Sequence, residues 1–219
     1  MTEALYNYIK EYMTEERAAL FDKMASDRTR HVTCVVENIY QPHNASAVLR
    51  SCDCFGVQDV HIIENDNDWE VNKGVSLGAS KWLSINRYNE GTSNTKSCLQ
   101  ALKKKGYKIA ATTPHKDDYT ISDLPLDEPV ALVFGTEVSG ITQDVMDEAD
   151  LFVRIPMYGF TESFNISVAA ALSLYELTKR LREENIDWPL SVDAQNELKL
   201  SWAKQSIRES EKIIARFNG

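Results

Sequence analysis

Four polar side chains that could take part in chemistry lie close together in the stretch 155–175. They are Thr161, Glu162, Ser163 and Asn165. Pro156 and Gly159 interrupt any regular element before them. A helix begins near Ile166, and either Ser163 or Asn165 is suited to cap it. This helix is apolar nearly all round, which predicts that it is buried. A polar loop held against a buried helix suits a binding or catalytic site, and an ordinary strand-to-helix turn is the alternative.

A glycine-rich loop, 135–142, follows the apolar run 130–134, which is the clearest candidate for a buried strand. The loop has the glycine spacing of a phosphate-binding GxxxxGK[ST] loop, but Ile141 replaces the lysine that would contact the phosphates. Glu137 inside the loop would also repel a polyphosphate. The sequence therefore predicts a ligand that carries no phosphate groups.

Asn44 and Arg50 belong to a predicted helix over 45–55. Asn44 is expected to cap this helix, and Gly56 is expected to end it. Arg50 shares the helix with apolar neighbours, so its guanidinium needs a partner. A salt bridge to Asp53, three residues further on, is the structural alternative to a functional role.

Two further patterns are weak. The segment 74–78 spells GxSxG around Ser76, but the residues before it are polar and do not predict the strand that a nucleophile elbow needs. A serine hydrolase is the alternative that a serine-directed probe would test. The four cysteines show neither CxxC spacing nor suitably spaced histidines, so we expect free thiols and no metal site.

The elements that must position these residues alternate between strands and helices. Short apolar runs predict strands at 32–36, 57–63, 83–88, 107–112, 130–134 and 152–155. Helical patterns fall at 14–24, 45–55, 93–105, 142–148, from 166 onward and at 193–217. Because a strand, helix, strand unit pairs its strands in parallel, we predict an α/β fold. Ligands of such sheets bind at the carboxyl ends of the strands.

The chain of 219 residues is long enough for one sizeable domain with small appendages. It contains no apolar run of transmembrane length and no signal-peptide pattern, so we expect a cytoplasmic protein that does not engage a membrane. The formal net charge of −9 argues mildly against nucleic acid binding by the whole surface, but it allows local basic patches. Such patches occur at Arg28 and Arg30, and at Lys179, Arg180 and Arg182. The ordinary explanation of the first cluster is a solvated linker. The ordinary explanation of the second is that positive charges complement the dipole at the end of a helix.

Three stretches of the chain together resemble one family. They are 38–56, with Asn44 and Arg50, then 132–140, with Gly135 and Glu137, and finally 155–169. They resemble the three motifs of the SPOUT RNA 2′-O-methyltransferases, most closely the TrmH type that methylates guanosine-18 of tRNA. The flanking helices also resemble the tRNA-contacting helices of that subgroup.

The resemblance implies a parallel α/β sheet with helices on both faces, a C-terminal trefoil knot and a homodimer. It divides the chain into an N-terminal helical extension, 1–31, a methyltransferase domain, 32–183, and a C-terminal helical extension, 184–219. The family transfers a methyl group from S-adenosylmethionine to a ribose 2′-OH of RNA. Methylation of rRNA or of a tRNA wobble nucleotide, and RNA binding without catalysis, are the alternatives.

The resemblance also implies a role for each site residue. The residues that would hold the cofactor, mostly through backbone groups, are Thr112, Gly135, Ile155 and Phe164. Arg50 would activate the 2′-OH and Asn44 would orient it, while the site would be completed by Glu137, Ser163 and Asn165. The expected tRNA contacts are Arg28, Arg30, Lys179, Arg180 and Arg182.

Overall fold

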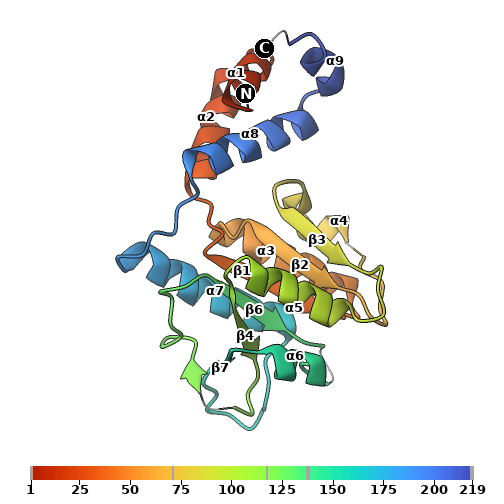
Figure 1. Ribbon diagram of the computed structural model, residues 1–219, viewed down its shortest axis with the longest axis vertical. Coiled ribbons are helices and arrows are strands. Elements are labelled where there is room, and N and C mark those ends of the chain that lie inside the picture. Colours follow the sequence, from red (N-terminus) through yellow and green to blue (C-terminus); the bar gives the residue numbers. More distant parts are fainter. Residues whose placement is uncertain (1, 71, 117, 137–138, 218–219) are drawn as a thin grey trace. The chain divides into compact units, whose positions relative to one another are not determined.

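The computed structural model describes residues 2–70, 72–116, 118–136 and 139–217, which fold into two compact units. One unit combines the two ends of the chain, 1–29 and 189–219, and the other consists of 30–188 (Figure 1). The unit formed by 1–29 and 189–219 lies within the two predicted extensions, and residues 30–31 and 184–188 belong to the other unit. None of the described helices is long and apolar enough to cross a membrane.

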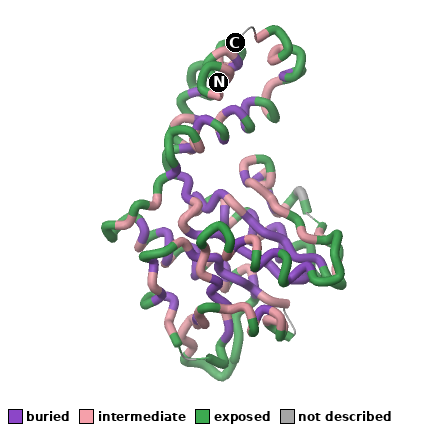
Figure 2. Tube along the Cα trace, viewed as in Figure 1, coloured by how far each residue is buried: buried purple, intermediate pink, exposed green. Residues whose placement is uncertain are grey.

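The larger unit is built on a parallel sheet whose described strands lie in the order β3-β2-β1-β6-β4-β7-β5. The strands are β1 (Val32–Glu37), β2 (Asp59–Ile63), β3 (Ser84–Tyr88), β4 (Lys108–Thr112), β5 (Tyr119–Thr120), β6 (Val130–Phe134) and β7 (Leu151–Arg154). The central strands β1 and β6 are buried along their whole length, as expected for apolar strands covered on both faces. Figure 2 shows this buried centre in purple.

Helices cover both faces of the sheet. The helices of this unit are α3 (Pro42–Phe55), α4 (Lys73–Ser76), α5 (Asn94–Lys104), α6 (Gln143–Glu148) and α7 (Ile166–Glu183), with the 3₁₀ helix η1 (Ala79–Lys81). The helices α3 and α7 pack against each other, and their apolar side chains join the core on one face, with Leu132 of β6. On the other face, α5 and α6 cover Val133 of the same strand.

The helical unit contains α1 (Thr2–Lys10), α2 (Glu15–Ser26), α8 (Val192–Ser206) and α9 (Ser210–Ile214). Helix α8 packs against both α1 and α2. The rings of Phe21 in α2 and Trp202 in α8 meet edge to face at 5.7 Å. Asp22 of α2 forms ion pairs with Lys10 of α1 at 3.2 Å and with Lys199 of α8 at 3.0 Å. Charged groups therefore also link the first and last segments of the chain.

Most of the predicted strands and helices are confirmed, with shifted ends. The predicted cap of the 45–55 helix is wrong. Helix α3 begins three residues earlier, with Pro42 in its first turn and Gln41 as its cap, because proline is preorganised for the start of a helix. The two-residue strand β5 lies between the predicted strands 107–112 and 130–134, and α1 was not predicted. Strand β5 is too short to show an alternating pattern, whereas Leu5 and Ile9, four residues apart in α1, give the amphipathic pattern of a helix.

The prediction that the helix after Ile166 is buried all round is also wrong for the single chain. Val168, Leu172 and Tyr175 of α7 are 44%, 41% and 54% exposed. Their spacing of four and three residues places them on one stripe of the helix. The opposite stripe, which includes Ala170, Leu174 and Leu177, is fully buried.

Candidate active site

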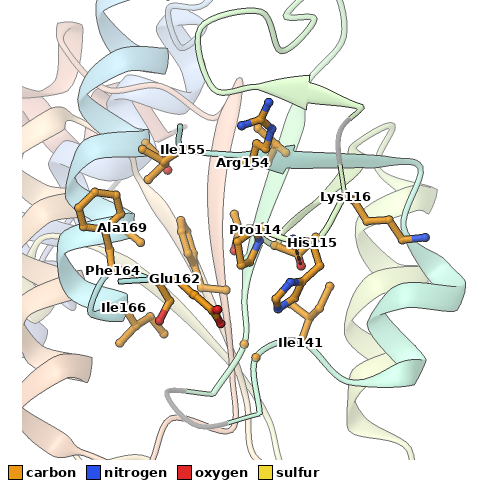
Figure 3. Close-up of a pocket in the computed structure, with 18 of the residues that line it drawn as sticks. Pro114, His115, Lys116, Ile141, Arg154, Ile155, Glu162, Phe164, Ile166 and Ala169 are labelled. Atoms are coloured by element: carbon orange, nitrogen blue, oxygen red, sulfur yellow. Dashed lines mark hydrogen bonds between the residues drawn. The ribbon is translucent and has the colours of Figure 1, made fainter. Parts of the chain in front are cut away.

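A pocket of about 570 Å³ lies at the carboxyl ends of β4, β6 and β7. Its walls come from the segments 112–116, 134–136, 139–141, 153–157 and 162–166, with a few side chains from neighbouring elements (Figure 3). Its volume is in the range that holds a small-molecule ligand or cofactor. The parallel pairing of β4 with β6 and β7 places these strand ends side by side. The pocket therefore has the position expected for a ligand of an open α/β sheet.

One wall is a tightly folded glycine loop. The backbone of Thr136 exchanges hydrogen bonds with that of Gly140, at 2.9 and 3.1 Å. A Cβ atom at Gly135 would lie 2.1 Å from the carbonyl oxygen of Gly140, a distance that no side chain could occupy. Gly140 has a φ of 70°, which glycine adopts without strain. The loop therefore closes on itself only because both positions are glycine.

The end of this loop is anchored by a buried carboxylate. Thr142 caps α6, and its hydroxyl donates to Glu37 Oε1 at 2.8 Å while its backbone N–H donates to Glu37 Oε2 at 3.2 Å. Thr95 Oγ1 of α5 donates to the same carboxylate at 2.6 Å. Glu37 is fully buried at the end of β1. Three donors satisfy its charge, and together they link β1, α5 and the glycine loop.

The second loop of the pocket ends in a cap that also contacts α3. Asn165 caps α7 by accepting from the backbone N–H of Ser167 at 2.9 Å, as one of the two predicted caps. Its side-chain amide donates to Asn44 Oδ1 at 3.2 Å. Asn44 lies in the first turn of α3 and is almost fully buried. The two predicted catalytic amides thus join the starts of the helices α3 and α7.

The four residues predicted to hold the cofactor all line the pocket: Thr112, Gly135, Ile155 and Phe164. The predicted catalytic residue Ser163 lines it as well. The hydroxyl of Thr112 donates to the carbonyl oxygen of Val133 at 2.8 Å, so this side chain fastens β4 to β6. Glu137 lies outside the described residues.

Arg50 does not line the pocket. Its side chain is exposed on α3, six residues beyond Asn44. Within the described part of the chain, the side chain of Arg50 forms no hydrogen bond or ion pair, so the alternative of a salt bridge with Asp53 is not seen. An exposed guanidinium in this state is available to a partner from outside the chain.

The basic residues predicted to contact tRNA have partners within the chain. Arg28 is only 4% exposed and its guanidinium lies 5.5 Å from the ring of Trp202. The other four have partly or largely exposed side chains that pair locally: Arg30 with Asp59, Lys179 with Glu183, Arg180 with Glu184, and Arg182 with the ring of Trp188. Arg28 is therefore poorly placed for RNA contact, whereas Lys179 and Arg180 pair with carboxylates that are themselves exposed.

Three basic side chains of the pocket were missed from the sequence. His115 and Lys116 follow β4, and Arg154 ends β7 (Figure 3). Their place directly after strands that end at one sheet edge is the signal that could have found them. Ser76, by contrast, is buried in α4, and the described residues directly before this helix form no strand, so they do not build a serine elbow.

Comparison of the sequence with known protein families agrees with a cofactor pocket at this position. Residues 31–175, two thirds of the chain, match the family described as the SpoU rRNA Methylase family. The chain belongs to this family. It is therefore an RNA methyltransferase, and its nearly full-length similarity to curated members and to a solved structure supports the assignment.

Two curated relatives are named tRNA (guanosine(18)-2′-O)-methyltransferase. The one from Borreliella burgdorferi is 38% identical over 96% of this chain and 94% of its own length. The one from Thermus thermophilus is 29% identical over 88% of this chain and 98% of its own length. Among solved structures, the Aquifex aeolicus TrmH/SpoU tRNA modifying enzyme has a TM-score of 0.79, with 27% identity, and covers 89% of this chain and 98% of its own. The predicted fold class, the α/β-knot fold of SPOUT enzymes, is confirmed by this likeness.

The close approach at Gly135 yields a direct test of the pocket. We expect Gly135→Ala to weaken binding of S-adenosylhomocysteine at least tenfold, because the added methyl group displaces Gly140 and opens the loop. Gly159→Ala is the matched control, since nothing lies within 4 Å of its added Cβ. Calorimetric titration of both variants measures the difference, and melting temperatures show whether the fold survives. Equal affinities for the two variants would contradict the role of the glycine loop.

Proposed function

We propose that this protein transfers a methyl group from S-adenosylmethionine to the 2′-oxygen of guanosine-18 in tRNA. The observation that carries the proposal is the meeting of the four predicted cofactor residues in one pocket, beside the Asn44–Asn165 contact. The curated relatives that match nearly the whole chain are named for this reaction. Methylation of rRNA or of a wobble nucleotide is the alternative within the same chemistry, and we place the protein in the cytoplasm, where tRNA is modified.

The pocket suits a cofactor that contains adenosine and lacks phosphates. The glycine loop presents backbone groups near Gly135 and has no lysine at Ile141, and Phe164 and Ile155 supply apolar surface for a ring. Bound there, S-adenosylmethionine would supply an electrophilic methyl group. We assign Gly135, Ile155 and Phe164 to the adenosine and Thr112 to the support of the strand end beneath it.

Arg50 is proposed as the residue that engages the ribose and the adjacent phosphate. A ribose hydroxyl is a weak nucleophile and must lose its proton as it attacks, and a guanidinium beside a phosphate can hold both groups in place. The Asn44–Asn165 contact fixes the start of the helix that carries Arg50. Glu137, Ser163 and Asn165 complete the proposed catalytic group.

The proposed tRNA surface uses Arg30, Lys179, Arg180 and Arg182, without Arg28. Phosphates can replace the exposed carboxylates of Glu183, which pairs with Lys179, and of Glu184, which pairs with Arg180. Most of the excess of acidic residues falls in 30–188, whereas the helical unit is nearly balanced in charge. The helical unit therefore repels RNA less than the sheet unit does, and we propose that it also contacts the tRNA.

We further propose a homodimer that covers the exposed stripe of α7. Val168, Leu172 and Tyr175 present apolar surface that a single chain leaves in water. Leu172→Glu should place a charge in this interface and convert a dimer into a monomer in light scattering. Leu77→Glu, at a leucine that is 65% exposed on a loop, is the control and should leave the mass unchanged. A wild-type monomer at micromolar concentration would rule the interface out.

The substrate and the role of Arg50 are tested together by methyl transfer to tRNA. Wild-type protein should methylate a transcript with guanosine at position 18 and not one with 2′-deoxyguanosine there. Arg50→Ala should lower the single-turnover rate by about 10²–10⁴ while S-adenosylhomocysteine affinity and melting temperature stay close to wild type. Arg50→Lys should not restore the rate, because an ammonium cannot bridge two acceptors in a plane.

Two outcomes would contradict these assignments. Methylation of the 2′-deoxy transcript, or of a wobble nucleotide in its place, would reject guanosine-18 as the acceptor. An Arg50→Ala protein that turns over at the wild-type rate would remove Arg50 from the catalytic group, and a lowered melting temperature would then indicate a structural role.

A further inference from the structure

The pocket contains one acidic side chain whose role is not explained by the fold. Among the described lining residues, Glu162 is the only carboxylate. It lies on the loop between β7 and α7, and Figure 3 shows its carboxylate directed into the pocket, opposite His115. Within the described part of the chain it forms no hydrogen bond or ion pair. Nothing in the fold therefore requires a negative charge at this position.

The histidine and the two cationic side chains of the pocket lie on a different wall. His115 and Lys116 follow β4, and Arg154 ends β7. The ammonium group of Lys116 lies 5.5 Å from the ring of Phe152, beside the pocket rather than against Glu162. The pocket thus has an acidic side and a basic side. A ligand that carries a positive group and a carboxylate would be oriented by this polarity.

We propose that Glu162 makes the pocket prefer a sulfonium-bearing methyl donor over the neutral product of the reaction. This inference rests on the function proposed above. During transfer, a bond would form between the 2′-oxygen and the methyl carbon as the bond between sulfur and that carbon breaks. Sulfur would keep the electron pair of the broken bond, and the 2′-oxygen would lose its proton to the surrounding solvent. The sulfur therefore changes from a cation to a neutral thioether. A carboxylate nearby attracts the positive sulfur of the donor by Coulomb energy, and the thioether sulfur of the product lacks this attraction.

The size of the preference follows from the exposure of Glu162. Its side chain is accessible to water, so solvent screens the attraction. Pairs of this kind change an affinity by about two- to fivefold at low salt. Mobile ions weaken the attraction further as the ionic strength rises. The effect is large enough to help the spent cofactor leave when donor and product compete for the same pocket.

The test compares a cationic and a neutral ligand. Sinefungin carries an ammonium group where the donor has its sulfonium, and S-adenosylhomocysteine is neutral at that position. Calorimetry gives the affinity of each for wild type, Glu162→Gln, Glu162→Lys and Glu128→Gln. Glu128 lies just before the amino end of β6, whereas the pocket lies at the carboxyl end of this strand. It pairs with Lys108 at 3.3 Å, so its variant removes the same charge far from the pocket.

We expect Glu162→Gln to lower the preference for sinefungin by about two- to fivefold at low salt and Glu162→Lys to lower it further, with Glu128→Gln like wild type. High salt should shrink the wild-type preference. An unchanged ratio of affinities in both Glu162 variants, or an equal loss for both ligands, would overturn the inference while leaving the proposed function intact. A wild-type protein that binds neither ligand would overturn both.

Discussion

The close approach of two backbone segments at Gly135 and Gly140 is the constraint on which the rest of the site depends. A Cβ atom at Gly135 would collide with the carbonyl of Gly140, so the loop can fold over the end of β6 only with glycine there. The folded loop leaves space between itself and the ends of β4 and β7, and this space is the pocket. At the far end of the loop, Thr142 donates two hydrogen bonds to the buried carboxylate of Glu37, and these bonds hold that end in place.

Two polar contacts connect the loops of the pocket to the rest of the sheet unit. Glu37 links the glycine loop to β1 and α5, and the amide contact between Asn44 and Asn165 joins the starts of α3 and α7. Each contact spans more than fifty residues of sequence, so each helps to define the fold as well as the site. The candidate site therefore lies where these long-range contacts meet, at the carboxyl ends of parallel strands.

Much of this could be predicted from the sequence, because strand periods and glycine spacing are local signals. The buried strand at 130–134, the loop after it and the absence of a phosphate-binding lysine at Ile141 predicted a pocket for a ligand without phosphates. The start of α3 was misplaced because a proline in the first turn outweighed the capping tendency of Asn44. The basic side of the pocket was missed because His115 and Arg154 are far apart in the chain and meet only when β4 and β7 pair. Likewise, the apolar pattern of α7 could not reveal which of its stripes the single chain leaves exposed.

We propose that the cofactor binds at the carboxyl ends of β4, β6 and β7. Amide hydrogen exchange with and without S-adenosylhomocysteine tests it most directly, because the slowed amides report where the ligand is held. We expect slower exchange in three separate segments, 112–116, 134–141 and 155–166, and little change in the helical unit. Protection centred elsewhere in the sheet unit, such as on 72–83, or confined to the helical unit, would contradict it.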